Sequence, residues 1–291
     1  MPQYSADHAP YPKLMSEDQI LISDKHGLRG DWELLRPRGN VHSVYRVGDV
    51  VVRVPRDHPE WIQDTHTEAV ALFALRDLPV ATPKIIAFDE DRDVADVPFT
   101  IIEFFKGAPY ADWDAPSDTL FKLGEIIASL HTSVTIVDDP EGRLDAVDLE
   151  EPRRWLETAA LTSSELAWAE EKLNEWEPLL ERGIIRVFVH NDLHELNILC
   201  SPSGELTMID WGDAGWGDPS FDFAVLPPTW LRPVLQGYSR STSLPDEARA
   251  RIAWNQLGLA LRRLSGKNPS FQKKGRKRFD ALRAVADQML G

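Results

Sequence analysis

The chain has 291 residues, of which 43% are hydrophobic and 27% are charged, and its formal net charge at pH 7 is -15. This length can bury one large core or two lobes, and the composition is typical of a globular protein rather than of a disordered chain. The acidic balance argues against nucleic acid as a main partner, because binding to phosphate backbones needs a basic surface.

The N-terminal segment carries no sign of a leader peptide. It has no basic stretch followed by an apolar one, and no apolar run in the chain approaches the length of about 18 residues that spans a membrane. Residues 1–16 are polar and include three prolines, which predicts a loose N-terminal arm. The single cysteine, Cys200, excludes an internal disulfide. We expect a monomeric cytoplasmic protein that needs no membrane.

Short runs rich in β-branched and aromatic residues follow the arm, separated by turn residues. They predict strands over residues 32–35, 43–47 and 50–54, then a helix over 61–78, then strands over 84–88 and 99–104. The predicted N-terminal lobe therefore spans residues 17–106 and contains about five strands, with one helix inserted after the third.

From residue 117 onward the apolar spacing becomes helical. It predicts helices from 117, after Pro152, near 163, over 245–264 and over 270–290, with one strand over 186–189 leading into a loop. Residues 107–291 are thus expected to form a larger, mainly helical C-terminal lobe. A basic run over 267–278 is interpreted as a solvated helix start rather than as a nucleic-acid site.

The most informative segment reads V-H-N-D-L-H-E-L-N-I-L over residues 189–199. Asp192 and Asn197 lie in this loop between apolar runs, and Asp210 follows at the end of a short predicted strand. Phosphoryl transfer needs these residue types, because a base accepts the hydroxyl proton and oxygen ligands hold Mg²⁺ against the phosphates. The kinase loop is written H-R-D-x-x-x-x-N, and His190, Asp192 and Asn197 have the same offsets. We expect Asp192 to be the catalytic base, and Asn197 and Asp210 to bind Mg²⁺.

Two other interpretations of this segment remain open at this point. Asp192 and Asn197 are also common turn residues. Alternatively, His190, Asp192, His194 and Asp210 could gather a transition metal, as in a metal-dependent hydrolase. In that case Asn197 and the later G-D-P motif would have no role. His190 itself is expected to brace the loop backbone.

Asp222, in the stretch F-D-F-A after Gly217-Asp218-Pro219, is the second candidate for structural support. A carboxylate there can accept backbone N–H groups of the catalytic loop, whereas the alternative is an Asp-Pro turn into a helix. We favour the bracing role for Asp222.

The N-terminal lobe must supply a cation for the phosphates. Arg53 stands on the third predicted strand, and a guanidinium can bind phosphate oxygens through two hydrogen bonds. Glu68, in the following helix, is expected to pair with Arg53 and orient it. Gly39 and Asn40 lie between the first two predicted strands, where a turn could cover the phosphates.

The segment that connects the lobes contains Glu103, Phe104 and Phe105. Its backbone groups are expected to hydrogen-bond the edge of a nucleobase. The sequence does not distinguish adenine from guanine specificity.

Three motifs in order resemble the aminoglycoside phosphotransferase family, a kinase-like group that includes macrolide phosphotransferases and choline kinases. The family loop H-G-D-L-H-x-x-N stands here as H-N-D-L-H-E-L-N from His190 to Asn197. The I-D-W segment begins at Ile209, and the G-D-P-x-x-D motif runs from Gly217 to Asp222. A helix that ends in Leu-His, over residues 123–131, also fits. Two positions depart from the pattern, with Asn191 in place of the common Gly and Arg53 in place of the common Lys.

The resemblance implies an α+β, bilobal, protein-kinase-like fold with an antiparallel N-terminal sheet, and a Mg²⁺-dependent enzyme with ATP or GTP as phosphate donor. It implies transfer to a hydroxyl group of a small molecule. We expect an antibiotic acceptor, either an aminoglycoside, whose cationic groups suit an acidic chain, or a macrolide. A metabolic kinase of the choline, sugar or amino-alcohol type on the same fold is the alternative.

Overall fold

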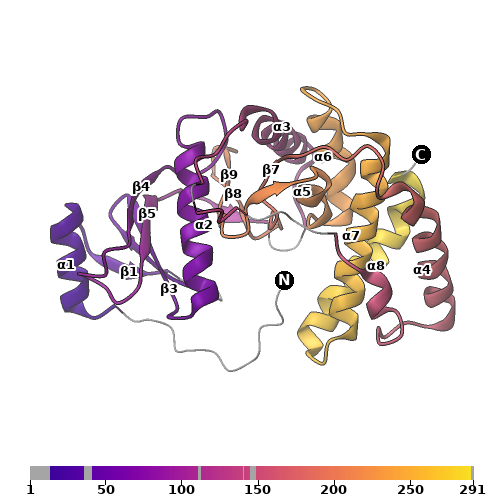
Figure 1. The fold of residues 1–291 in the computed structure, drawn as a ribbon, viewed down its shortest axis with the longest axis horizontal. Coiled ribbons are helices and arrows are strands. Elements are labelled where there is room, and N and C mark those ends of the chain that lie inside the picture. Colours follow the sequence, from indigo (N-terminus) through magenta and orange to yellow (C-terminus); the bar gives the residue numbers. More distant parts are fainter. Residues whose placement is uncertain (1–13, 36–40, 111–112, 140, 145–148, 290–291) are drawn as a thin grey trace.

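The computed structural model describes residues 14–35, 41–110, 113–139, 141–144 and 149–289. In these residues a five-stranded sheet with two helices, here called the N-terminal lobe, packs beside a larger helical region, here called the C-terminal lobe (Figure 1). The elements of the N-terminal lobe are α1 (Ser16–His26), β1 (Trp32–Leu34), β2 (His42–Val47), β3 (Val50–Pro55), α2 (Pro59–Leu75), β4 (Ile85–Asp89) and β5 (Phe99–Glu103). All neighbours in the strand order β1-β2-β3-β5-β4 are antiparallel.

The sheet lies between α1 and α2 (Figure 1). Successive side chains of a strand point to opposite faces, and β3 follows this rule. Val52 and Val54 pack in one cluster with Ile22 of α1, whereas Val51 packs in a second cluster with residues of α2. Arg53, the only charged residue of β3, therefore faces α2 and the C-terminal lobe.

The prediction of five strands with a helix after the third is confirmed. The inserted helix begins at Pro59, whose fixed φ suits a first helical turn, and ends at Leu75 rather than at residue 78. The predicted loose arm over residues 1–16 was wrong at its C-terminal end, because Leu14 is buried and α1 begins at Ser16. Residues 1–13 lie outside the described chain.

The C-terminal lobe contains helices around three short strand pairs. Its elements are β6 (Ala108–Pro109), α3 (Ser117–Ser133), a 3-10 turn (Pro152–Trp155), α4 (Ser163–Trp176), a second 3-10 turn (Glu177–Leu179), β7 (Val187–Val189), β8 (Ile198–Cys200), β9 (Leu206–Met208), β10 (Gly215–Gly217), α5 (Ser220–Ala224), a third 3-10 turn (Pro228–Trp230), α6 (Leu231–Tyr238), α7 (Asp246–Ser265) and α8 (Pro269–Met289). β7 pairs with β10, and β8 lies between β6 and β9.

Helices α3 and α6 cross at two glycines. A Cβ atom added to Gly124 would lie 2.0 Å from the carbonyl oxygen of Val234, and one added to Gly237 would lie 1.9 Å from that of Phe121. Only glycine permits so close an approach of two backbones. The crossing brings His131 of α3 within 3.1 Å of the Tyr238 hydroxyl on α6, and Asp222 links His131 to the loop that begins at His190.

Two predictions for the C-terminal lobe need correction. The helix predicted after Pro152 is a single 3-10 turn, whose Trp155 carbonyl accepts hydrogen bonds from the Ala159 N–H and the Ser265 hydroxyl. Arg278, in the basic run expected to be solvated, is only 2% exposed. Its guanidinium donates to carbonyl oxygens at the C-terminal end of α5, namely those of Ala224, Val225 and Leu226.

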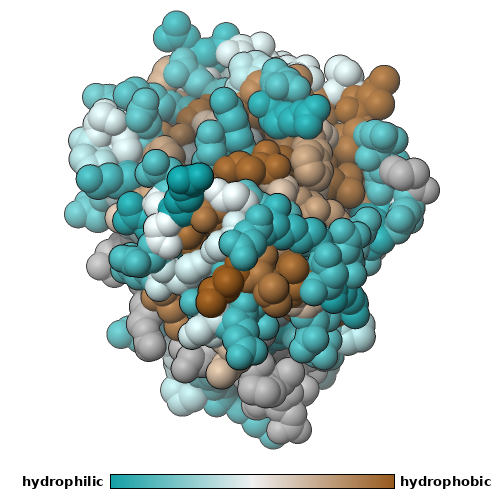
Figure 2. Space-filling model, turned by 90° about the vertical axis from the view of Figure 1, so that its left-hand side faces the viewer, coloured by the Kyte–Doolittle hydropathy of each residue, from teal (hydrophilic) through white to brown (hydrophobic). Residues whose placement is uncertain are grey.

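No helix in the described ranges has the length and apolar character needed to cross a bilayer. Apolar and polar side chains alternate over the α1 end of the molecule (Figure 2). Ile20 and Leu21 of α1 are 60% and 49% exposed, and single exposed apolar residues of this kind are ordinary on protein surfaces.

Candidate active site

The first two residues of the loop from His190 to Asn197 hold its backbone in place. β7 leads into it, and Asn191 takes a left-handed backbone conformation with φ 65°. Asparagine tolerates this conformation better than most residues, which makes it a workable replacement for Gly. The ring of His190 is buried, receives the Asp192 N–H at Nδ1 (3.4 Å) and donates from Nε2 to the Ile209 carbonyl (3.0 Å). Both ring nitrogens of His190 are therefore engaged.

Asp222 braces the same loop from α5. It is fully buried and accepts hydrogen bonds from the backbone N–H groups of His190 (3.1 Å) and Asn191 (2.7 Å). The predicted contacts are thus present. His131 Nε2 lies 3.0 Å from Asp222, a contact that sequence reasoning missed although the Leu-His ending of α3 marked the residue. Burial opposes ionisation, but the bonds with His131 and the loop hold the pKa of Asp222 below its usual range.

Asp192 and Asn197 are joined by hydrogen bonds. The Asn197 amide nitrogen donates to the backbone carbonyl (2.9 Å) and to the side-chain Oδ2 (3.1 Å) of Asp192. Burial, and then the nearby carboxylates of Asp213 and Asp210, raise the pKa of Asp192 well above its usual range. A carboxylate with a raised pKa is a stronger base for a nearby proton. His194 Nε2 lies 3.6 Å from Asp192 Oδ2.

The two lobes meet at Arg53. Its Nε donates to Glu68 (3.0 Å) and its Nη2 to Asp210 (2.6 Å), while the hydroxyl of Thr100 also reaches Glu68 (3.3 Å). The predicted Arg53–Glu68 pair is present, and Glu68 is buried. His42 lies 3.4 Å from Arg53, and burial together with this guanidinium lowers the pKa of His42 to about 3.

Asp210 has φ 70°, a conformation that a non-glycine residue adopts at a cost of order 1 kcal/mol. Strain of this kind persists where the surroundings hold it, and here the ion pair with Arg53 does so. Burial raises the pKa of Asp210, but the Arg53 charge outweighs it and keeps this pKa below its usual range. The carboxylate is therefore ionised at neutral pH.

The side chains of Asn197 and Asp210 offer hard oxygen atoms of the kind Mg²⁺ takes. Since the Asn197 nitrogen points to Asp192, its amide oxygen faces away from that residue. Oδ1 of Asp210 binds Arg53, and Oδ2 has no hydrogen-bond partner within the described chain. The donor set therefore fits Mg²⁺.

Glu103 is the last residue of β5, and Phe104 and Phe105 follow it toward β6. Phe104 N–H donates to the Asp49 carbonyl (2.9 Å), whereas the Phe105 N–H makes no hydrogen bond to any described residue. That free donor suits a nucleobase edge. All three residues also line a separate cavity of about 790 Å³ beside α3, and none of the predicted phosphate or metal residues lines it. Gly39 and Asn40 lie outside the described residues.

A cavity of about 530 Å³ opens between the lobes, beside the catalytic loop. Asn191, Gly212 and Asp213 line it from the loops, Asp64 lines it from α2, and Asn255 from α7. A Cβ atom added to Gly212 would lie 3.0 Å from that of Asp64, so the glycine permits the close approach of α2. Sequence reasoning missed Asp64 and Asn255, because the helical pattern alone gives no sign that they face a cavity.

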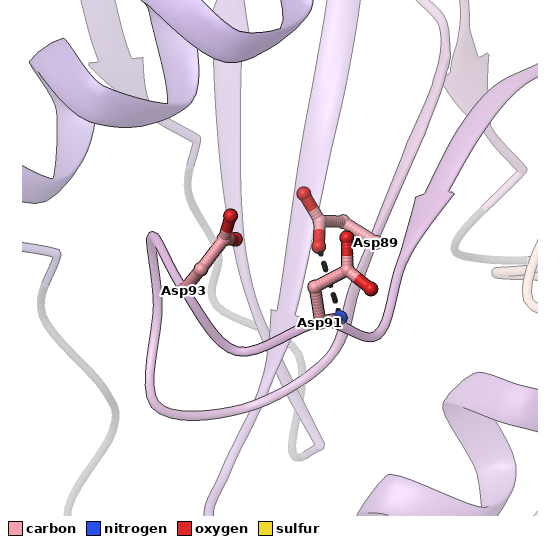
Figure 3. Close-up of side chains that lie close together, drawn as sticks. All are labelled: Asp89, Asp91 and Asp93. Atoms are coloured by element: carbon pink, nitrogen blue, oxygen red, sulfur yellow. Dashed lines mark hydrogen bonds between the residues drawn. The ribbon is translucent and has the colours of Figure 1, made fainter.

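A second acidic group lies on the far side of the N-terminal lobe, where Asp89 ends β4 and Asp91 and Asp93 follow in the next loop (Figure 3). Oxygen atoms of the three carboxylates lie within 4.8 Å of one another. The Lys25 ammonium lies 3.0, 3.1 and 2.6 Å from them in turn, and His26 lies 2.7 Å from Asp89. The positive charge of Lys25 balances part of the negative charge of this group, which is called here the Lys25 cluster.

Comparisons with known proteins agree on a family of phosphotransferases. A model of the phosphotransferase enzyme family matches residues 33–254, well over half of the chain. No curated protein sequence matches significantly.

Solved structures with the same fold include the GDP complex of aminoglycoside 2'-phosphotransferase-IIIa, at 17% identity over 92% of this chain and 98% of that chain, with a TM-score of 0.66. A microcompartment-associated aminopropanol kinase has 21% identity over 94% of this chain and 97% of its own, with a TM-score of 0.63. Macrolide 2'-phosphotransferase MphH from Brachybacterium faecium has 19% identity over 91% and 98%, with a TM-score of 0.58. At these identities the likeness shows a shared kinase-like fold.

Proposed function

The chain belongs to the phosphotransferase enzyme family and is a small-molecule phosphotransferase, and from this premise we propose that it moves the γ-phosphate of ATP or GTP to a hydroxyl group of an antibiotic with the help of Mg²⁺. The observation that carries the proposal is the meeting of Arg53 from one lobe with Asp210 from the other, beside the bonded pair of Asp192 and Asn197.

In this proposal Asp192 is the catalytic base. The acceptor oxygen attacks the γ-phosphorus, its proton passes to an Asp192 oxygen, and the bond from the γ-phosphorus to the bridging oxygen breaks, which releases a nucleoside diphosphate. Asn197 holds Asp192 in place through the bond to Oδ2. Asp222 and His190 keep the loop backbone in position for that attack.

Arg53 is the proposed phosphate-binding cation. Its Nε and Nη2 are taken by Glu68 and Asp210, which fixes the plane of the guanidinium, and Nη1 makes no hydrogen bond within the described chain. That nitrogen is available to a phosphate oxygen. Asn197 and Asp210 would hold Mg²⁺, which neutralises the charge that develops on the phosphates.

Two classes of acceptor follow from the similar structures, which include antibiotic phosphotransferases and an aminopropanol kinase. We favour an antibiotic, an aminoglycoside or a macrolide, and retain a metabolic amino alcohol as the second candidate. The phosphotransferase family decides against the metal-dependent hydrolase, and the geometry agrees. Both ring nitrogens of His190 are already hydrogen-bonded, so this residue does not offer a metal ligand.

The test is a transfer assay with purified protein, Mg²⁺ and either ATP or GTP, across aminoglycosides, macrolides, choline and aminopropanol. Mass spectrometry should detect one added phosphoryl group on at least one antibiotic, and a chelator should abolish it. Transfer to the amino alcohols alone would replace the antibiotic assignment by the metabolic one. No phosphorylated product with either nucleotide would reject the proposed function.

A further inference from the structure

His42 is a buried histidine of β2 that lies beside the phosphate-binding candidate Arg53. Val44 of β2 is opposite Arg53 of β3, and His42 precedes Val44 by two positions. His42 and Arg53 are therefore diagonal neighbours on the same face of the sheet, the face that packs against α2. Both side chains lie in the interior of the N-terminal lobe, since His42 is 4% and Arg53 is 7% exposed.

The hydrogen bonds around His42 define which ring nitrogen carries the proton. A guanidinium has no acceptor, so Arg53 Nη2 donates to His42 Nδ1 over 3.4 Å. The proton of the neutral ring is then on Nε2, which donates to the Thr65 hydroxyl oxygen at 3.0 Å. The Thr65 hydroxyl donates to the Trp61 carbonyl, one turn earlier in α2 (2.9 Å). A continuous chain of hydrogen bonds thus runs from α2 through His42 to Arg53.

This chain completes the set of protein contacts of the Arg53 guanidinium, which has five N–H bonds. The Nε–H donates to Glu68, and the two N–H bonds of Nη2 are directed to Asp210 and His42. Nη1 makes no hydrogen bond to any described residue. Three protein contacts therefore fix the guanidinium and leave the two N–H bonds of Nη1 for a ligand.

Two of the three anchors belong to the same lobe as Arg53. Glu68 comes from α2 and His42 from β2, whereas Asp210 comes from the C-terminal lobe and is also a proposed Mg²⁺ ligand. Thr65 and Glu68 are one turn apart on α2, so they share a face of the helix. α2 thus holds Arg53 twice, directly through Glu68 and indirectly through Thr65 and His42. The N-terminal lobe can keep the guanidinium oriented without the contact to Asp210.

A neutral acceptor suits the position of His42. Glu68 and Asp210 already place two carboxylates on one guanidinium. A third carboxylate would add negative charge where phosphates bind, whereas a neutral imidazole accepts a hydrogen bond without adding charge. Burial and the Arg53 charge lower the pKa of His42 to about 3, which agrees with a neutral ring at pH 7.

We infer that His42 is a positioning residue for nucleotide binding, which orients the Arg53 guanidinium so that Nη1 binds the phosphates of the donor and ties this orientation to α2 through Thr65. The inference rests on the proposed function, because it takes Arg53 as the phosphate-binding cation. It confines the effect of His42 to affinity for the phosphates and excludes an effect on the nucleobase.

The experiment measures nucleotide binding to the full chain by calorimetry with Mg²⁺ and without an acceptor. It uses whichever of ATP and GTP binds the wild-type protein, and the matching nucleoside in displacement titrations. His42→Phe keeps an aromatic ring and removes both hydrogen bonds of the imidazole. It should raise the Kd of the triphosphate at least about tenfold and leave that of the nucleoside within about twofold. A merely structural role would weaken both ligands alike.

Two further variants separate the contacts of His42. His42→Asn retains an acceptor near the Nδ1 position and should bring the triphosphate Kd back to within about threefold of wild type. Thr65→Val keeps the volume but removes the link to α2, and it should raise the triphosphate Kd about threefold. His66→Phe is the matched control, at a histidine of α2 that is 15% exposed and packs on Phe88, and it should bind both ligands as the wild type does.

A double variant tests whether His42 acts through Arg53. In the Arg53→Met background, His42→Phe should change the triphosphate Kd by less than about twofold, because the guanidinium that it orients is gone. Thermal unfolding establishes that each variant is folded at the temperature of the titration.

Three results would overturn the inference and leave the phosphotransferase function standing. They are wild-type triphosphate affinity in a folded His42→Phe protein, an equal loss for triphosphate and nucleoside, and a full further loss in the Arg53→Met background. If His42→Phe does not fold, Thr65→Val decides, and wild-type triphosphate affinity in that variant would overturn the inference. Absence of binding of both ATP and GTP to the wild-type protein would reject the proposed function and this inference with it.

Discussion

Two groups of acidic residues in this molecule differ in charge balance. Figure 3 shows the three carboxylates of the Lys25 cluster, and the Lys25 ammonium lies within 3.1 Å of each of them. Between the lobes, Asp64, Asp192, Asp210 and Asp213 lie near one another, and within the described chain Asp210 alone pairs with a Lys or Arg. A group of acids thus indicates chemistry where the protein leaves the charge unbalanced.

The pKa values of acids in the two groups shift in opposite directions. Burial opposes ionisation of Asp89, but Lys25 and His26 outweigh it and lower its pKa. Burial and mutual repulsion raise the pKa of Asp64 to about 7, and burial and Asp210 raise that of Asp213. Lys25 and His26 balance the first group in part, whereas Asp64 and Asp213 have no cationic partner among the described residues.

The largest effect is expected at Asp192. Asp192→Asn keeps the shape and the Asn197 contact region but removes the base, so kcat should fall by on the order of 10³-fold. Nucleotide affinity, measured by calorimetry, should stay close to that of the wild type, because Arg53 and the connecting segment are untouched. Loss of nucleotide binding with retained transfer would contradict the role of Asp192.

Arg53→Met should weaken both function and stability. It leaves the buried Glu68 without its cation, which costs about 3 kcal/mol of unfolding free energy, and it should raise the nucleotide KM at least about tenfold. Urea unfolding and steady-state kinetics measure the two effects. Arg53→Lys is the control, since it keeps the charge but loses the paired geometry. A wild-type KM in Arg53→Met would remove Arg53 from the phosphate site.

Asp64→Asn tests the unbalanced charge through stability. The raised pKa of Asp64 means that its contribution to stability is fully present below its ordinary pKa of about 4 and is lost as pH rises through about 7. Above pH 7, the free energy of unfolding of the variant should therefore exceed that of the wild type by about 1 kcal/mol, after allowance for solvent screening. This difference in unfolding free energy between the variant and the wild type should decrease toward pH 4. If denaturant titrations gave the same difference in unfolding free energy at every pH, the pKa of Asp64 would not be raised in the folded protein.

Lys25→Met should have the smallest effect on activity. Lys25 pairs with carboxylates far from the phosphate site, so kcat/KM should stay within about twofold of wild type. The thermal midpoint should fall, because Asp89, whose side chain is 2% exposed, keeps only His26 and the Asp91 N–H as partners. A large loss of transfer with an unchanged midpoint would erase the distinction between the two acidic groups.

Sequence patterns predicted much of the fold and the centre of the site. The turn-separated β-rich runs marked all five strands of the N-terminal sheet. The spacing of Asp192, Asn197 and Asp210 pointed to the loop that we propose to be catalytic. The pairing of Arg53 with Glu68 and the bonds from Asp222 followed from the chemistry that those residues must satisfy.

Other features depend on tertiary packing and have little local signal. α1 was missed because its polar sequence resembles a loose segment, while its stability comes from Ile22 packing on the sheet. The 3-10 turn at Pro152 depends on contacts with α7. Asp64 and Asn255 face the cavity only because the two lobes close over it. Nothing in their neighbours along the chain distinguishes them from surface residues.

The central claim is that the acids between the lobes do the chemistry and the Lys25 cluster does not. The most direct measurement compares Mg²⁺-dependent phosphoryl transfer in Asp210→Asn and in Asp91→Asn, each beside the wild type, by mass spectrometry of the phosphorylated acceptor. Asp210→Asn should lose transfer by on the order of 10³-fold, whereas Asp91→Asn should keep it within about twofold. Wild-type transfer in Asp210→Asn, or abolished transfer in a folded Asp91→Asn protein, would contradict the claim.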